Sequence, residues 1–158
     1  MPTRSIPEGY HTVTPYLIVH DAVAALDFYQ RAFGAKELLC LRSPDGKIAH
    51  AEIKVGDSPI MMAGEYPDMG YLSPKSLGGS ATSLMLYVED VDARFHQAIE
   101  AGATEVRPIQ DQFYGDRSGT LRDPFGHVWT IATHKEDVSQ DEIERRFAQM
   151  SADKPSDG

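Results

Sequence analysis

Two residues with acid–base chemistry lie two positions apart in the first half of the chain. His50 and Glu52 belong to Lys47–Val55, which has the composition of a strand. Side chains two apart on a strand point to the same face, so the carboxylate could orient the imidazole for proton transfer near neutral pH. The same pair could lie on a solvated sheet face. Ala49 and Ile53, with Ala51, would occupy the opposite, packed face, and the sequence leaves open which face lines a pocket.

A second group of candidate binding residues lies on an expected long turn, Gln110–Ser118. Gln112 supplies an amide, Tyr114 an aromatic hydroxyl, and Arg117 a guanidinium that could fork onto a carboxylate or phosphonate. Binding groups often lie on such loops because a rigid scaffold holds them. The alternative is that Arg117 pairs with Asp116 and holds the turn in place.

The composition excludes several classes of function. A chain of 158 residues with 41% hydrophobic content suits one domain, and its net charge of −9 opposes nucleic acid and anionic membranes. The sequence lacks a long apolar span, an apolar leader core, glycine-rich nucleotide motifs and a serine nucleophile elbow. A single cysteine, Cys40, rules out an internal disulfide. We therefore expect a cytoplasmic protein whose partner is a small molecule, and neither a membrane nor a nucleic acid.

The first half of the chain reads as one strand, one helix and three more strands. Asp21 caps a helix over Ala22–Phe33, and Gly34 ends it. Turn residues separate the expected strands, which are Val13–Val19 before the helix and Glu37–Arg42, Lys47–Val55 and Ser58–Ala63 after it. Pro15 cannot donate a ladder hydrogen bond, so it must lie at an edge, a bulge or a strand end.

The second half repeats this order. Asp90 caps a helix that Gly102 ends, and the segment Gly34–Leu38 overlays Gly102–Val106. The expected strands are Thr82–Val88, Thr104–Ile109, Gly119–Arg122 and His127–Thr133. The turn Asp123-Pro124-Phe125-Gly126 is explained by backbone geometry, since proline sets φ and glycine permits a positive φ. A duplicated module is the simplest account.

These segments give the expected organisation of the chain. It comprises an N-terminal arm (1–12), a first βαβββ module (13–63), a linker loop (64–81), a second module (82–134), an amphipathic C-terminal helix (135–150) and a disordered tail (151–158). Two curved mixed sheets of an α+β fold would then enclose one cleft.

The duplication, the helix entry Val19-His20-Asp21 and the turn Asp123-Pro124-Phe125-Gly126-His127 resemble the vicinal oxygen chelate superfamily. That group includes glyoxalase I, extradiol dioxygenases and bleomycin-resistance proteins. The segment Asp111–Arg117 and the later Ile131–Asp137 are similar to its PhnB-like branch. The resemblance implies the glyoxalase/bleomycin-resistance fold, a homodimer and a small-molecule cleft.

The resemblance also implies positions for four metal ligands, two on each module. These positions fall on Thr14, His50 or Glu52, Ser83 and Thr130, so most lack a His or a carboxylate. A divalent metal usually needs at least three such ligands. The inherited site is therefore expected to be lost, and a metal is not the favoured cofactor, although a rebuilt site could use His11, His50, Glu52 or His134.

Two functions stay open on this basis. One is an enzyme of the lyase, isomerase or group-transfer type acting on an oxygen-rich substrate, with His50 as acid–base and Glu52 as its orienter. The other is a non-catalytic protein that sequesters a drug or metabolite. In either case we expect Thr14, Ser83, Gln112, Tyr114, Arg117 and Thr130 to contact the ligand.

Overall fold

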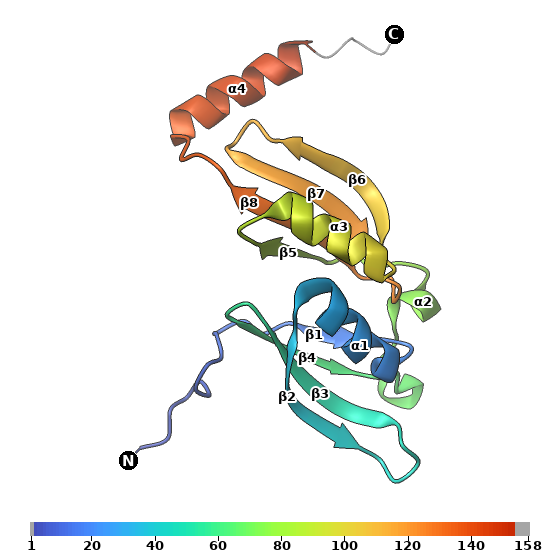
Figure 1. Cartoon of the computed structure of the whole chain (residues 1–158). Helices are drawn as coiled ribbons and strands as arrows, with labels where there is room; N and C mark the ends of the chain where they lie inside the picture. Colours follow the sequence, from blue (N-terminus) through green and yellow to red (C-terminus); the bar gives the residue numbers. More distant parts are fainter. Residues whose placement is uncertain (1, 154–158) are drawn as a thin grey trace.

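A computed structural model describes residues 2–153, and it consists of two four-stranded mixed sheets with four α-helices (Figure 1). The first module contains β1 (Tyr16–Ile18), α1 (Ala22–Phe33), β2 (Lys36–Arg42), β3 (Ile48–Val55) and β4 (Ser58–Ala63). The second contains β5 (Ser83–Tyr87), α3 (Val91–Ala101), β6 (Thr104–Asp111), β7 (Asp116–Arg122) and β8 (Val128–His134). The linker carries a 3₁₀ helix, η1 (Pro67–Met69), and α2 (Pro74–Leu77), and the chain ends in α4 (Gln140–Asp153).

Both sheets have the same strand order, which confirms the duplication. The orders are β1-β4-β3-β2 and β5-β8-β7-β6, with the first pair parallel and the others antiparallel. Each module is thus a curved mixed sheet with one helix, as the α+β prediction requires. β1 and β5 are edge strands, so Pro15, whose carbonyl accepts from Met61 N at 2.9 Å, lies at the end of an edge strand.

The core lies between the sheets and the two module helices. Figure 1 shows α1 and α3 side by side at the centre of the molecule, with one sheet on either side. Ala51, Ile53 and Val55 of β3 are buried on the helix side of the first sheet, and Trp129 and Ile131 of β8 are buried on that of the second. Burial of apolar surface against these helices is the main stabilising contribution.

Local capping explains where the helices begin and end. The Asp21 and Asp90 carboxylates accept from Ala24 N at 3.0 Å and from Ala93 N at 3.1 Å. Gly34 ends α1 with φ 66°, a left-handed conformation that favours glycine.

The linker is more ordered than a plain loop. Ser73 caps α2, and the Glu65 carboxylate accepts from the Ser73 and Ser76 hydroxyls and from Ser73 N. Hydrogen bonds from Ser73, then Ser76, lower the pKa of Glu65 to about 2. Glu65, eight residues before Ser73, therefore organises this turn. The sequence has no apolar periodicity here that would predict a helix.

Other element boundaries differ from the sequence prediction. β1 is shorter than Val13–Val19, because only Tyr16–Ile18 pair with β4, and Val13 is exposed. β6 runs on to Asp111 and β7 starts at Asp116, so the long turn is reduced to residues 112–115, closed by Gln112 N donating to Asp116 O at 2.6 Å. α4 begins later than 135 and continues to Asp153, and Ser139 caps it by accepting from Glu142 N. The end of the tail, 154–158, lies outside the described residues.

A buried carboxylate joins the two modules. Asp123 is 3% exposed and accepts from the Tyr29 hydroxyl of α1 and from Trp129 Nε1 at 2.9 Å. Its other oxygen accepts from Phe125 N at 2.9 Å and His127 N at 3.0 Å. The structural role predicted for this turn is thus extended, because the turn also binds the first module.

None of the helices in the described part of the chain is long and apolar enough to cross a membrane.

Candidate functional site

The helix-free face of the first sheet brings His50 and Glu52 together. Both lie on β3, opposite the face that α1 covers, and they are directly paired across the strands with Leu41 and Leu39 of β2. Their facing atoms, His50 Nε2 and Glu52 Oε2, are 3.4 Å apart. His50 and Glu52 therefore lie on the face of the first sheet that α1 does not cover.

Ala49 does not lie with Ala51 on the packed face as expected. It is half-buried and lines a cavity on the open side, while Ile48 is buried. The β2–β3 pairing shifts register between Leu41 and Arg42. Such an irregularity changes the alternation of side chains locally, which a strict period of two cannot anticipate.

Two tyrosines complete the polar cluster around His50. The Tyr16 hydroxyl lies 3.0 Å from His50 Nδ1, and the Tyr10 hydroxyl donates to Glu52 Oε1. The rings of Tyr16 and His50 are also in contact, with centroids 5.6 Å apart. His50 thereby connects a phenol on one side with a largely buried carboxylate, 12% exposed, on the other.

The environment of this cluster favours protonated tyrosines. Partial burial, then the neighbouring Tyr71 and Tyr66 hydroxyls and the Glu52 carboxylate, raise the pKa of Tyr16. The hydrogen bond to Glu52 raises the pKa of Tyr10. Both phenols therefore stay protonated at neutral pH and can donate hydrogen bonds.

A cavity of about 580 Å³ opens beside the cluster. Its lining is mostly apolar and aromatic, comprising Tyr16, Ile18, Ala49, Ala63, Tyr66, Met69 and Tyr71. The floor comes from β1, β3 and β4, and the wall comes from the linker around η1. We call it the open-face cavity. Its volume and lining are typical of a small-molecule site.

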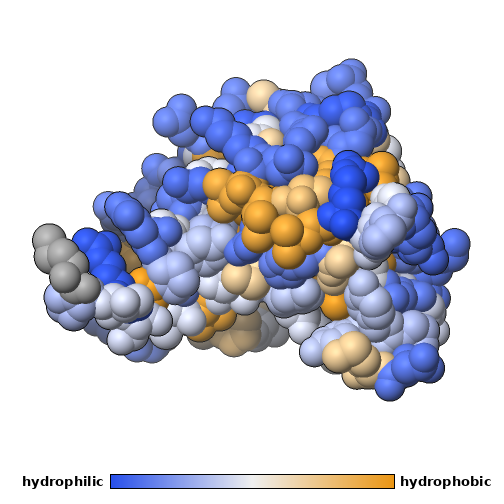
Figure 2. Space-filling view, turned by 90° about the horizontal axis from the view of Figure 1, so that it is seen from below, coloured by the Kyte–Doolittle hydropathy of each residue, from blue (hydrophilic) through white to orange (hydrophobic). Residues whose placement is uncertain are grey.

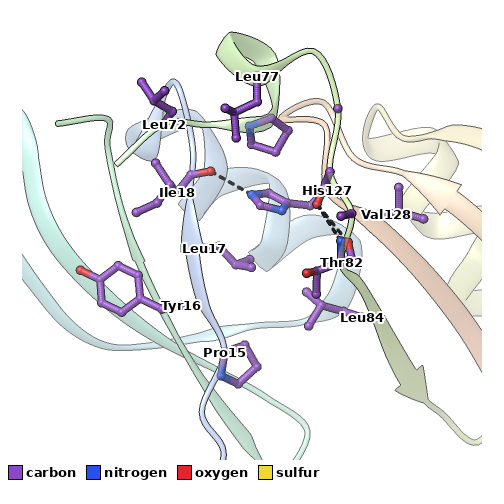
Figure 3. Close-up of a pocket in the computed structure, with 14 residues that line it drawn as sticks. Pro15, Tyr16, Leu17, Ile18, Leu72, Leu77, Thr82, Leu84, His127 and Val128 are labelled. Atoms are coloured by element: carbon purple, nitrogen blue, oxygen red, sulfur yellow. Dashed lines mark hydrogen bonds between the residues drawn. The ribbon is translucent and has the colours of Figure 1, made fainter. Parts of the chain in front are cut away.

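A second cavity, of about 380 Å³, lies at the seam between the modules (Figure 3). Pro15, Leu72, Leu77, Leu84 and Val128 give it apolar walls. Figure 3 shows the His127 ring reaching from the second module to β1, where Nε2 lies 2.9 Å from the Ile18 carbonyl oxygen. Because His127 is engaged in joining the modules, the open-face cavity, with its tyrosines and adjacent His50, is the stronger candidate site.

Exposed apolar side chains surround the open face. Leu39, Leu41 and Met69 are 40%, 51% and 71% exposed. Figure 2 shows one face of the molecule on which hydrophobic residues gather at the centre, with hydrophilic residues around them. Such a patch is typical of a ligand or partner surface.

The remaining predicted contacts do not reach this cavity within one chain. Ser83 and Thr130 lie on the open face of the second sheet, where the Thr130 and Thr120 hydroxyls are 3.0 Å apart. Thr14 precedes β1, and its hydroxyl donates to the His11 carbonyl at 3.2 Å.

The turn residues lie at the far end of the second module, next to α4. Tyr114 contacts Phe113 edge-on, and Phe113 contacts Phe147 of α4. Arg117 lies on the helix-covered face and pairs with Asp92 of α3 at 2.9 Å and with Asp111 at 3.3 Å. Arg117 thus links α3 and β6 to β7, and its partners are neither a ligand, as predicted, nor Asp116, as in the alternative.

The donor set does not fit a divalent metal. In residues 2–153 no three His, Cys, Asp or Glu side chains come close enough together to hold one. His50 and Glu52 supply two candidate ligands, whereas Thr14, Ser83 and Thr130 supply only neutral hydroxyls, which are weak ligands.

A polar cluster on the second sheet was missed at the sequence level. Asp116, 4% exposed, accepts from the Tyr87 hydroxyl at 2.8 Å and lies 2.7 Å from His134 Nδ1. His134 Nε2 lies 2.8 Å from Asp137, which precedes α4. Hydrogen bonds to the Asp116 carboxylate, which has the larger effect, and to the Asp137 carboxylate raise the pKa of His134. Only cross-strand pairing of Asp116 with His134 brings them together.

We expect this cluster to make stability depend on pH. A raised folded pKa means that the stabilisation from His134 is complete below the unfolded value of about 6.5 and is lost as the pH rises through the folded value. His134→Gln should therefore lower the melting temperature most at about pH 5. The difference in melting temperature between the unchanged protein and this variant should narrow towards about pH 9. Calorimetry with His96→Gln, an exposed histidine on α3, provides the control; a gap that widens with pH would contradict the assignment.

Comparison with known proteins supports one family. The model of the Glyoxalase/Bleomycin resistance protein/Dioxygenase superfamily matches residues 10–131. An uncharacterized protein of Mycobacterium tuberculosis is 42% identical over 135 residues, which cover 84% of this chain and 79% of the relative.

Solved structures agree with this match. TioX from Micromonospora sp. ML1 is 31% identical, with a TM-score of 0.62 over 78% of this chain and 98% of that one. The PhnB protein from Bacillus cereus, at 20% identity, has a TM-score of 0.61 over 78% and 99% of the two chains, and this likeness shows the fold alone.

Proposed function

Because this chain belongs to the Glyoxalase/Bleomycin resistance protein/Dioxygenase superfamily, we propose that it binds a small organic molecule in the open-face cavity. The observation that carries the proposal is the junction at Tyr16. This side chain lines the apolar cavity and also contacts His50, so a bound molecule would meet aromatic walls and one polar edge. This proposal places the ligand in a cavity of the first module and the linker, whereas the sequence led us to expect the cleft between the modules.

A binding role without catalysis is the leading form of this proposal. Apolar area supplies affinity in such cavities, and a few placed polar groups supply orientation. Tyr66, Met69 and Tyr71 provide the first, while Tyr16 with His50 provides the second. Sequestration of a metabolite or drug requires nothing more.

An acid–base enzyme is the second candidate, and one observation favours it. The path from the Tyr16 hydroxyl through His50 to Glu52 could carry a proton between the cavity and a carboxylate. Tyr16, which lines the cavity, would then touch the substrate, with His50 as acid–base and Glu52 as its orienter. A lyase or isomerase reaction on an oxygen-rich substrate matches such a relay.

We also propose that this chain belongs to the PhnB-like branch and that it forms a homodimer in the cytoplasm. Leu39 and Leu41 on the first open face, and Met85 and Tyr87 on the second, leave apolar surface that another copy could cover. Ser83 and Thr130, and the turn residues Gln112 and Tyr114, would contact a ligand only in such an assembly. A mass of one chain by light scattering would contradict it.

The proposal is tested by measuring ligand binding to the unchanged chain and to a variant in which a larger side chain fills the cavity. A library of small aromatic compounds is screened by saturation-transfer NMR, and hits are titrated calorimetrically with and without EDTA. We expect saturable binding of about one molecule per chain, unaffected by EDTA and lost in Ala49→Phe, because Ala49 lines the cavity. Binding that survives Ala49→Phe, or that needs added metal, would refute the proposed site.

The same titrations separate binder from enzyme. If a hit is consumed, His50→Ala should lower turnover by about 10²- to 10⁴-fold, the usual contribution of a positioned acid–base group. His96→Ala, on the surface of α3, should leave turnover unchanged. Equal turnover in both variants would remove His50 from the mechanism.

A further inference from the structure

We propose that the open-face cavity selects an organic cation, with a quaternary or protonated amine held among tyrosine rings and a hydrophobic body on the cavity floor. This inference rests on the proposed function and names the class of ligand. It is carried by three tyrosines that line one cavity, with the Glu52 carboxylate outside the lining and close to Tyr16.

The three tyrosines come from two parts of the chain and line a single cavity. Tyr16 projects from β1, whereas Tyr66 and Tyr71 flank η1 in the linker. A tyrosine ring carries partial negative charge on its face and attracts cations. Several rings around one space form the arrangement by which proteins bind quaternary ammonium groups.

The linker fixes the backbone at two of these tyrosines before any ligand arrives. Tyr66 N donates to Tyr71 O at 2.9 Å, and Tyr71 N donates to Tyr66 O at 3.0 Å, which closes the loop as an isolated bridge. Gly70 ends η1 with φ 80°, a turn that a residue with a side chain would adopt only under strain. A preorganised loop reduces the entropy lost on binding.

The charges around the cavity favour a cation. Glu52 is close enough to Tyr16 to contribute to its raised pKa, as are Tyr66 and Tyr71. Among the described residues that line the cavity, none is a lysine or arginine. Lys54 lies further along β3 on the same face and does not line it. An anionic ligand would face the negative ring faces, with the Glu52 carboxylate beyond Tyr16 and outside the lining.

The size and floor of the cavity define the rest of the ligand. About 580 Å³ exceeds the space that an ammonium group alone would fill. Ile18, Ala63 and Met69 offer apolar surface for a hydrophobic body. The preferred ligand is therefore amphiphilic, with one cationic head.

The experiment compares three benzyl or phenyl probes of different charge on the full chain. Benzyltriethylammonium, benzyl alcohol and benzenesulfonate are titrated by NMR, and we expect the cation to bind at least about 10-fold more tightly than the others. Tyr66→Leu and Glu52→Gln should each weaken the cation by about 5- to 30-fold, whereas Tyr66→Phe, which keeps the ring face, should stay within about 2-fold. Phe147→Leu, at an exposed aromatic of α4 away from the cavity, is the matched control and should change nothing.

The outcomes distinguish this inference from the proposed function. If benzyl alcohol binds as tightly as the cation and Ala49→Phe abolishes both, the cavity binds ligands but does not select charge. The inference then fails, and the proposed function stands. Cation binding that is equally weakened by Tyr66→Phe and Tyr66→Leu would also overturn it. If none of the three probes binds, the inference fails, and the library screen decides the proposed function independently.

Discussion

Asp123→Asn should lower the free energy of unfolding by about 2–4 kcal/mol, because it places an amide where a buried carboxylate accepts four hydrogen bonds. One carboxylate oxygen accepts from Tyr29 and Trp129, and the other accepts from two backbone N–H groups. An asparagine carries a donor at one of these positions. In either orientation an NH₂ group faces a group that can only donate, either Trp129 Nε1 or the backbone.

The matched control is Asp45→Asn in the corresponding turn of the first module. Asp45 is exposed, and its carboxylate accepts from Lys47 N at 3.0 Å. Its replacement should cost less than about 0.5 kcal/mol, as for most surface substitutions. Urea denaturation followed by circular dichroism measures both; similar losses at the two aspartates would show that the junction between the modules does not depend on Asp123.

The second large effect is expected for Gly126→Ala, in the same turn. Gly126 has φ 91°, and a Cβ built there would lie 2.7 Å from Cβ of Pro74 in α2. We expect a loss of about 2–4 kcal/mol, from backbone strain together with a contact that moves α2 or the turn. Pro74 also lines the seam cavity, so the packing of the linker on the second module should change with it.

Gly46→Ala isolates the contribution of that contact. Gly46 has φ 85° at the equivalent turn of the first module, and nothing lies within 4 Å of the position that the added methyl group would take. It should therefore lose only the backbone strain, about 1–2 kcal/mol. Chemical denaturation of both variants provides the measurement. If the two alanines cost the same, Pro74 does not press on the turn.

The duplicated fold could be predicted from the sequence because its signals are local. Asp21 and Asp90 cap the helices within three residues of themselves, and turn residues separate short strands. Each signal depends on neighbours in the chain, which the sequence displays directly. The linker was the exception, since Glu65 organises α2 from a distance and without a periodic pattern.

The candidate site was predicted in part, for the same reason. His50 and Glu52 could be paired because strand side chains alternate. Their partners Tyr10 and Tyr16 could not be paired with them, since contacts across 42 and 34 residues follow from strand order. Arg117 looked like a ligand contact because its partner Asp92 lies on another element, in the first turn of α3.

The sequence by itself therefore determined the family, the two modules, their helices and the residue types available for chemistry, because these depend on local pattern and on motifs. Only the tertiary structure decided which of those residues meet. The sheet order placed Tyr16 beside His50, a register irregularity turned Ala49 into the cavity, and the closed linker brought Tyr66 and Tyr71 over it. A binding site is a property of contacts between distant segments, and the free energy of packing the modules selects those contacts.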